Sequence, residues 1–194
     1  MTSVTSLVRN APTRALNRAF AGAHPDSSYD LELSPHIKGA RVPYIGIDEG
    51  ENAHAAISAL IRGEWADRRF WPYACVIRDW MSDIGVQRVW TDWHIQETGR
   101  FVGSCDLLVS GGPRSSGVIE VKFVNRGLPE FHRMDHLFQL SLYARGLAEM
   151  RGGFDRYWGA IAYVCPSART IRVFEWTVGM PRCCQSADFL LRAA

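Results

Sequence analysis

Three side chains that could bind a metal ion and act on a phosphodiester lie close together in the sequence. Asp106 belongs to the segment VGSCDLLVS, and Glu120 and Lys122 belong to GVIEVKF. The turn-forming segment GGPRSS separates them, so we expect a hairpin in which Glu120 and Lys122 share one face of the second strand. Two carboxylates and an ammonium group on one sheet face are costly to bury without a counter-ion. A divalent metal ion would supply that charge, and the pattern therefore predicts a metal-dependent phosphodiester-cleaving site.

The spacing alone is a weak signal, because an acid and a base two residues apart in a strand usually form a solvated face. The surroundings strengthen it. Glu120 and Lys122 interrupt the apolar run GVIEVKFV, and Cys105, Leu107 and Leu108 surround the preceding carboxylate. Ionisable groups among such neighbours need partners.

A second group of polar residues follows in the segment 130–151. Gln139 and Tyr143 are four residues apart and therefore share one face of a helix, which His132 and His136 extend. Such a polar stripe on an otherwise apolar helix suggests a face turned toward the site or its substrate. The alternative for Gln139 and Tyr143 is a partly buried pair that satisfies backbone groups. For His132, simple exposure is the preferred interpretation.

The elements that must position these residues follow from the hydrophobic period. Helical spacing changes to strand alternation and back again, with glycines and prolines at the boundaries. One domain of class α/β (α+β) is predicted, with a mixed central sheet that contains a three-stranded antiparallel meander and is flanked by helices. The expected helices start near 51 and cover 73–85, 130–151 and 183–194, and the expected strands cover 86–96, 100–110, 117–124, 156–165 and 170–178.

The N-terminal region shows no comparably clear pattern. Its first 25 residues contain three arginines and no acid, a composition similar to that of a mitochondrial transit segment. An N-terminal arm or a short helix is the preferred interpretation. Residues 26–48 contain several Pro, Gly and Ser and are expected to be irregular. We therefore divide the chain into a lead-in segment, 1–35, and a single domain, 36–194.

Composition sets broad limits. The hydrophobic fraction of 47% and the charged fraction of 22% are those of a globular protein rather than a disordered one. No apolar run approaches the ~20 residues that cross a bilayer, so no membrane association is expected. The net charge of +2 is compatible with DNA binding but does not argue for it.

The cysteines favour a reducing compartment. Their number is odd and none are in C-x-x-C spacing, so disulfides are not expected. Small buried apolar side chains are the preferred interpretation, and no iron–sulfur cluster is expected. The five are Cys75, Cys105, Cys165, Cys183 and Cys184.

Several motifs resemble those of the PD-(D/E)XK nuclease superfamily. VGSCD contains Asp106, IEVK contains Glu120 and Lys122, and HLFQLSLY contains Gln139 and Tyr143. The last motif is similar to the Q-x-x-x-Y signature of one branch, which includes RecB-type nuclease domains and phage recombination exonucleases. The resemblance implies a restriction-endonuclease-like core.

The resemblance extends over roughly residues 46–165 and departs from the family name at one position. Cys105 stands where the name has proline, although G-x-x-D is a usual form in this branch. Upstream, GENAHAAI contains Gly50 and His54 and is similar to a helix that carries a glycine and a histidine in these nucleases.

The resemblance implies a role for each site residue. Asp106, Glu120, the carbonyl of Val121 and His54 would hold one or two Mg²⁺ or Mn²⁺ ions. Lys122 would orient or help to deprotonate the attacking water, or stabilise charge on the phosphate. The alternative for His54 is a core or helix-surface histidine.

Further residues have supporting roles in this interpretation. Gln139 and Tyr143 would position the active-site residues and the DNA backbone. Asp92 could assist a second metal ion, but a surface carboxylate of a hairpin is the preferred interpretation. Candidate nucleic-acid contacts are His136, Arg126, Arg133 and Arg114.

The function implied is that of a metal-dependent DNA nuclease, an exonuclease or end-processing enzyme of recombination, repair or phage DNA metabolism. Its partners would be single- or double-stranded DNA ends, a homo-oligomer or a recombination protein. Its compartment would be the cytoplasm of a bacterium or a phage-infected host, with mitochondrial import as the alternative. A catalytically silent nucleic-acid-binding or assembly module with the same fold is the alternative function.

Overall fold

A single mixed sheet of seven strands organises the computed structural model, which describes residues 1–33, 50–125, 127–153 and 156–193. The strand order is β1-β4-β5-β6-β7-β2, and β3 pairs with β4. The strands are β1 (Thr2–Ser3), β2 (Ser27–Glu32), β3 (Val86–Glu97), β4 (Phe101–Gly111), β5 (Ser116–Phe123), β6 (Tyr157–Cys165) and β7 (Thr170–Trp176).

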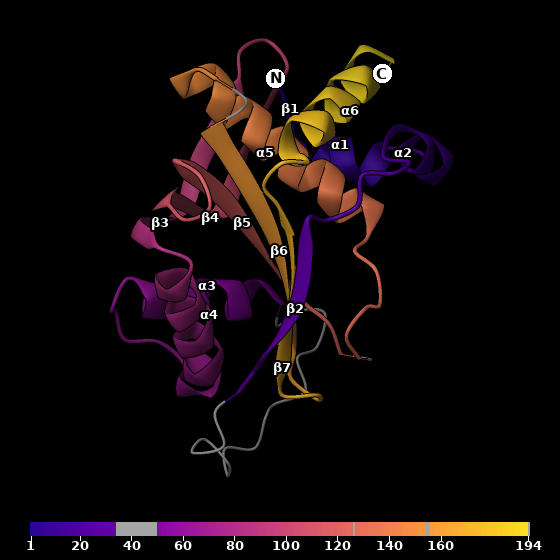
Figure 1. The fold of residues 1–194 in the computed structure, drawn as a ribbon. Helices are drawn as coiled ribbons and strands as arrows, with labels where there is room; N and C mark the ends of the chain where they lie inside the picture. Colours follow the sequence, from indigo (N-terminus) through magenta and orange to yellow (C-terminus); the bar gives the residue numbers. More distant parts are fainter. Residues whose placement is uncertain (34–49, 126, 154–155, 194) are drawn as a thin grey trace.

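Helices pack on both faces of this sheet (Figure 1). One apolar core lies between the sheet and α3 and α4, and the other lies between the sheet and α1, α2, α5 and α6. The central strand β6 is buried at every position, as expected for a strand covered on both faces. The helices are α1 (Val4–Asn10), α2 (Thr13–Ala19), α3 (Gly50–Ile61), α4 (Trp71–Asp83), α5 (Met134–Arg151) and α6 (Met180–Ala193), and a 3₁₀ helix, η3, spans Arg68–Phe70.

The predicted meander and fold class are confirmed. Strands β3, β4 and β5 pair antiparallel in sequence order. Helix α5 then connects β5 to β6, which pairs with it in parallel, and β7 returns antiparallel to β6. The sheet is therefore mixed and flanked by helices, as the change of hydrophobic period predicts.

The N-terminal region differs from the predicted arm. Strand β1 pairs in parallel with β4, and β2 pairs antiparallel with β7 along its whole length. Val4, Leu16 and Phe20 are buried in the core on the α5 side. The short-helix interpretation is thus confirmed by α1 and α2, although their apolar side chains show little periodicity in sequence. The expectation of irregular chain is wrong for residues 27–32, which form β2. Residues 34–49, which contain the rest of the stretch expected to be irregular, lie outside the described residues.

The side chain of Asp26 links the N-terminal region to the segment that follows β7. Its Oδ2 accepts hydrogen bonds from three consecutive backbone N–H groups, those of Thr177, Val178 and Gly179, at 2.5, 2.7 and 3.0 Å.

Within the described ranges, no helix is both long and apolar enough to cross a membrane.

Candidate active site

The predicted acidic residues lie where β4 and β5 separate. The ladder between these strands ends at the pair Leu107–Ile119, next to Asp106 and Glu120. Beyond this point β5 continues along β6, and the Val121 N–H donates to Asp106 Oδ2 at 2.7 Å. A carboxylate thus takes the place of a strand acceptor, which satisfies a backbone donor that burial would otherwise penalise.

Glu120 and Lys122 form an ion pair beside this carboxylate. Lys122 Nζ donates to Glu120 Oε2 at 2.8 Å, and the Glu120 side chain is fully buried, whereas that of Lys122 is 17% exposed. Burial and the neighbouring charge of Asp106 raise the pKa of Glu120 to about 7. Burial opposes the charge on Lys122, but the carboxylates of Glu120 and Asp106 outweigh it and raise the pKa of the ammonium group.

The second oxygen of Glu120 is in a different situation. Oε1 is buried and has no hydrogen-bond partner among the described residues. A buried carboxylate oxygen that no group contacts is energetically costly. It is therefore the atom of this site with the strongest physical need for a cation or a donor.

His54 brings α3 to the same place. Its Nδ1 lies 3.5 Å from Asp106 Oδ2, and its ring packs edge-on against Phe123, with centroids 5.4 Å apart. Burial works against ionisation of Asp106, but His54, Lys122 and the Val121 N–H outweigh it and hold the pKa of this carboxyl below its usual value. The predicted neighbours His54, Asp106, Glu120, Val121 and Lys122 are thus brought together.

The pair Gln139 and Tyr143 supports the cluster from α5. Gln139 Nε2 donates to the Tyr143 hydroxyl at 3.3 Å. Tyr143 is buried, and burial together with the charge of Glu120 raises its pKa. Gly103 on β4 makes room for this ring, because a Cβ there would lie 2.9 Å from Tyr143 Cε1. Tyr143 therefore packs against β4 from the α5 side of the sheet, close to the carboxylates.

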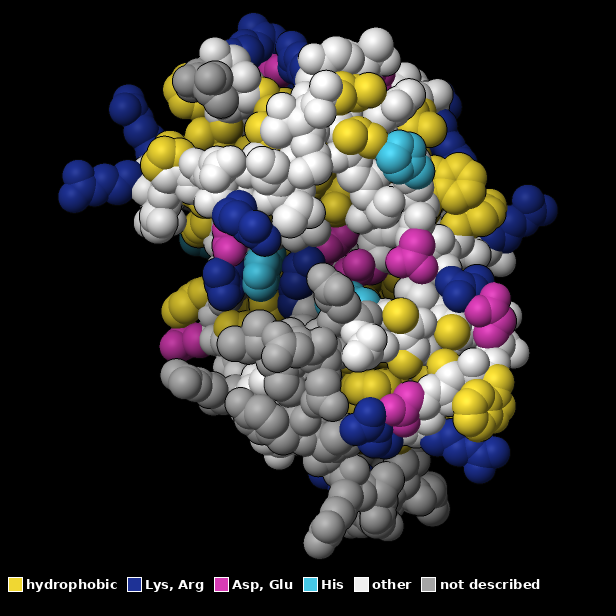
Figure 2. Space-filling view, turned by 180° about the vertical axis from the view of Figure 1, so that it is seen from behind, with side chains coloured by type: hydrophobic (Ala, Val, Ile, Leu, Met, Phe, Trp, Pro, Cys, Tyr) yellow, Lys and Arg dark blue, Asp and Glu magenta, His cyan; other side chains and the backbone are white. Residues whose placement is uncertain are grey.

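A hollow of about 470 Å³ opens onto the cluster. It is lined by His54, Ala55, Arg62, Asp92, Asp106 and Lys122. Figure 2, which shows the molecule from behind relative to Figure 1, has acidic side chains in a depression near its middle. Histidine, lysine and arginine side chains lie beside them. A charged substrate can therefore approach the cluster from solvent.

Asp92 lies at this hollow but as an exposed group. Its side chain is 61% exposed, and its Oδ2 lies 3.5 Å from Arg62 Nη1. Its backbone has a φ of +53°, which interrupts the alternation of β3. Trp90 and Trp93, which simple alternation would put on opposite faces, instead have ring centroids 6.0 Å apart and pack against the same core.

Two of the candidate nucleic-acid contacts, Arg133 and His136, lie at the start of α5. His136 Nδ1 is 2.9 Å from the Tyr163 hydroxyl, which also accepts from the Arg133 backbone N–H. The Arg133 guanidinium is 63% exposed and pairs with Asp135 at 2.7 Å. Burial and, as a smaller cause, the charge of Lys122 lower the pKa of His136 to about 4. This histidine is therefore near the cluster.

One of the predicted arginines, Arg114, is not brought to the cluster. Arg114 lies in the turn between β4 and β5, at the opposite end of these strands from Glu120. Ser116 to Glu120 alone spans ~13 Å of strand. Arg114 is therefore remote from the cluster, and its contact with nucleic acid stays a prediction. Arg126 lies outside the described residues.

The sequence alone did not identify Tyr163 and Arg62 as neighbours of the site. Tyr163 pairs with Lys122 in the register between β5 and β6. Arg62, which follows α3, donates to Thr91 Oγ1 and lines the hollow. The spacing of Arg62 eight residues after His54, two helical turns, is a sequence signal that could have indicated a common face.

The side chains of the cluster meet the needs of a divalent ion only in their chemistry. Among the described residues, no group of three or more His, Cys, Asp or Glu side chains is arranged to hold a metal ion. Lys122 contacts Glu120 Oε2 directly, and Glu120 Oε1 is buried without a hydrogen-bond partner in the described part of the chain. The chemistry of two carboxylates and an imidazole nevertheless fits Mg²⁺ or Mn²⁺, with the imidazole favouring Mn²⁺.

The described cysteines form no disulfide, and they lie in different parts of the fold. Cys183 and Cys184 are buried in α6 on one face of the sheet, whereas Cys75 belongs to α4 on the other. Burial raises the pKa of the Cys105 thiol, which lies beside Asp106 and Glu120.

Comparisons with known proteins give little further information. No family model and no curated protein matches the chain. Nine chains of solved structures match it. One, described as "Crystal structure of SSO0001", is 15% identical, with 98% of this chain and 85% of that chain covered and a TM-score of 0.34. A TM-score this low supports no inference about fold or function. The resemblance to PD-(D/E)XK nucleases stays a prediction from the motifs.

Proposed function

We propose that this protein is a metal-dependent deoxyribonuclease that hydrolyses phosphodiester bonds at the cluster of Asp106, Glu120 and Lys122. The observation that carries the proposal is Glu120 Oε1, a buried carboxylate oxygen without a partner among the described residues. Asp106 lies beside it, and the hollow gives solvent access to that carboxylate and to Lys122. A divalent cation bound here would neutralise phosphate charge and lower the pKa of the attacking water.

The chain's own residues have distinct tasks in this proposal. Asp106 is held by the Val121 N–H, so its carboxylate enters the reaction already oriented. His54, at 3.5 Å, adds an imidazole on the side of α3. These groups and Glu120 are the ones that would hold Mg²⁺ or Mn²⁺. Rigid placement on strands and a helix reduces the orientational cost of reaching the transition state.

Lys122 would act on the substrate side of the cluster. Its ammonium group keeps its charge, because two carboxylates raise its pKa. It can therefore orient the attacking water or donate a hydrogen bond to a phosphate oxygen that gains charge in the transition state. Gln139 and Tyr143 would hold the geometry from behind, since their contacts link α5 to this part of the sheet.

A catalytically silent nucleic-acid-binding module is the second candidate function. The direct contact of Lys122 with Glu120 favours it, because the two charges already compensate each other. In either case DNA is the proposed partner. The cytoplasm of a bacterium or a phage-infected host is the proposed location, and an end-processing role in recombination or repair is the proposed context.

The decisive experiment compares cleavage by the wild type and one isosteric variant. Linear duplex, single-stranded and circular DNA are incubated with Mg²⁺, with Mn²⁺ and with a chelator. We expect cleavage that needs the metal and that falls about 10³-fold in Glu120→Gln, equivalent to ~4 kcal/mol. Glu32→Gln is the matched control, because Glu32 is an exposed strand residue of β2.

Two outcomes would reject the nuclease. Folded wild-type protein that leaves every DNA intact with both metals has no such activity. Equal rates for Glu120→Gln and the wild type would move any activity away from this site. Calorimetry with Mn²⁺ then separates the candidates, because the silent module would bind DNA without binding the metal.

A further inference from the structure

Two exposed tryptophans border a second hollow on the same side of the sheet as α3. Trp65 is 85% exposed and Trp71 is 46% exposed, and both rings line one hollow, so they form a contiguous aromatic patch of the kind that marks binding sites. The hollow measures about 570 Å³, and its lining also includes the apolar residues Leu60, Ala66 and Pro72. It is therefore a mainly apolar surface with two aromatic walls.

This tryptophan hollow is next to the candidate active site along the chain. Arg62 lines the active-site hollow, and the next two residues, Gly63 and Glu64, line the tryptophan hollow. An ion pair of 2.8 Å joins Arg62 and Glu64. Helix α3 carries His54 at one hollow and Leu60 at the other, a separation of ~9 Å along the helix. That length equals about three nucleotides at the ~3.4 Å spacing of a stacked strand.

The charges around the tryptophan hollow favour an anionic ligand. Its two neighbouring acids are paired, Glu64 with Arg62 and Asp67 with Arg69. Arg68 lines the hollow and is exposed, so it adds a positive charge to the rim. A ligand with flat aromatic groups and a negatively charged backbone matches both the walls and the rim.

We propose that Trp65 and Trp71 stack an unpaired nucleobase of a single strand whose backbone continues along α3 into the active-site hollow. The inference rests on the proposed nuclease function and specifies its substrate as a single-stranded or frayed end. Stacking on indole rings accepts every base, so the site would be tolerant of sequence. Bases inside a duplex are stacked on both faces by their neighbours and have no free face for these rings.

The test measures DNA binding in the presence of a chelator, so that cleavage plays no part. Fluorescence anisotropy of a short mixed-sequence oligonucleotide is recorded in single-stranded, duplex and abasic form. We expect Trp65→Ala and Trp71→Ala to bind the single strand about 5- to 100-fold more weakly and the duplex almost unchanged. The abasic strand should bind the wild type as weakly as the single strand binds the variants.

The matched control is Phe189→Ala, which removes another aromatic side chain, 60% exposed, from α6 on the other face. Circular dichroism shows whether each variant is folded. Trp65→Ala removes the most exposed ring, so it carries the test even if Trp71→Ala weakens the start of α4. Single-strand affinity equal to that of the wild type in a folded Trp65→Ala variant would overturn the inference.

The inference and the nuclease proposal can fail separately. Metal-dependent cleavage by the wild type, with unchanged single-strand binding by the tryptophan variants, would reject the stacking site alone. Tryptophan-dependent binding without cleavage under Mg²⁺ or Mn²⁺ would support the stacking site and reject the nuclease. No measurable affinity of the wild type for single strands would overturn the inference directly.

Discussion

The carboxylate of Asp106 accepts a hydrogen bond from the backbone N–H of Val121 across the gap where β4 and β5 separate, at 2.7 Å. The same oxygen lies 3.5 Å from His54 Nδ1. The Asp106 side chain thus replaces a strand–strand hydrogen bond that is missing between β4 and β5, and it also contacts His54 on α3. The separation of the two strands is therefore what creates the candidate site.

Substitutions of Asp106 should separate this structural role from catalysis. Asp106→Asn keeps an acceptor for the Val121 N–H, whereas Asp106→Ala leaves that donor without one. We expect the Ala variant to lose about 1–3 kcal/mol in free energy of unfolding and the Asn variant less than ~1 kcal/mol. Both should lose the proposed cleavage activity. Urea unfolding and a cleavage assay check this, and full activity of Asp106→Asn would contradict the assigned role.

The ion pair of Glu120 and Lys122 can be tested by a double-mutant cycle. Lys122→Met leaves the fully buried Glu120 carboxyl without its counter-ion, so we expect a loss of about 3–5 kcal/mol in free energy of unfolding. Combining it with Glu120→Gln should recover much of that loss, because no buried charge then remains. Urea unfolding at constant pH measures all four proteins. Additive effects would show that the two groups are not coupled.

The features that were predicted correctly depend on local patterns. The hairpin of β4 and β5 follows from two apolar runs separated by GGPRSS, and Gly85 follows α4 with a φ of +82°, as a helix-terminating glycine should. The shared face of Glu120 and Lys122 follows from the period of a strand. Gln139 and Tyr143 are in contact because residues four apart meet on a helix.

The features that were missed depend on long-range pairing. Tyr163 is opposite Lys122 only in the β5–β6 register, which no local pattern specifies. Strand β2 pairs with β7 at the far end of the chain, and α1 and α2 are too short for a clear period. Arg114 lies far from the site for a simpler reason, since the hairpin turn is at one end of the β4–β5 ladder and the site is at the other.

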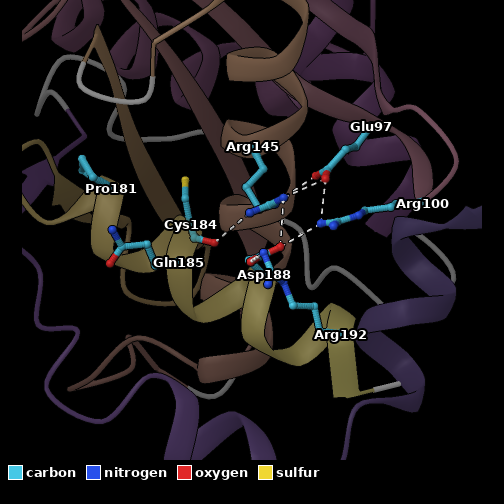
Figure 3. A pocket seen from close by; sticks show the side chains of 8 residues that line it. All are labelled: Glu97, Arg100, Arg145, Pro181, Cys184, Gln185, Asp188 and Arg192. Atoms are coloured by element: carbon cyan, nitrogen blue, oxygen red, sulfur yellow. Dashed lines mark hydrogen bonds and ion pairs between the residues drawn. The ribbon is translucent and has the colours of Figure 1, made fainter.

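A network of charged side chains fastens α6 to the rest of the fold (Figure 3). Arg145 on α5 contacts Glu97 at 2.7 Å and Asp188 of α6 at 3.3 Å. Arg100, in the turn after β3, contacts the same two acids at 2.9 and 2.7 Å. The Arg145 and Glu97 side chains are only 11% and 10% exposed, so this pair is poorly screened by solvent.

Removal of the buried acid should therefore destabilise the protein strongly. We expect Glu97→Gln to lower the free energy of unfolding by about 3 kcal/mol, because it removes the less exposed of the two carboxylates that contact the Arg145 guanidinium. Arg192→Ala is the control, since Arg192 pairs with Asp188 at 2.8 Å but is 72% exposed. That pair should be worth less than ~0.5 kcal/mol. Equal losses in urea unfolding would mean that burial does not determine the strength of this network.

His132 should make stability depend on pH. Its side chain is buried, and its ring lies edge-on to Trp176 and Phe174, with centroids 4.8 and 5.8 Å away. Burial and, to a smaller extent, the nearby His24 lower the pKa of His132 to about 4, against an ordinary value of 6.5. Simple exposure, the interpretation preferred for His132 from its sequence position, is therefore wrong.

The direction of the effect follows from proton binding. Between about pH 6.5 and 4 the unfolded chain binds a proton at His132 and the folded protein does not. The free energy of unfolding must therefore fall as the pH is lowered through this window, by up to about 3 kcal/mol, and His132 contributes no pH dependence above it. His132→Phe should make the fall between pH 6.5 and 5 shallower, whereas His94→Gln, at an exposed position, should not. Urea unfolding across this range measures the slopes, and identical slopes for His132→Phe and the wild type would contradict the burial of a neutral imidazole.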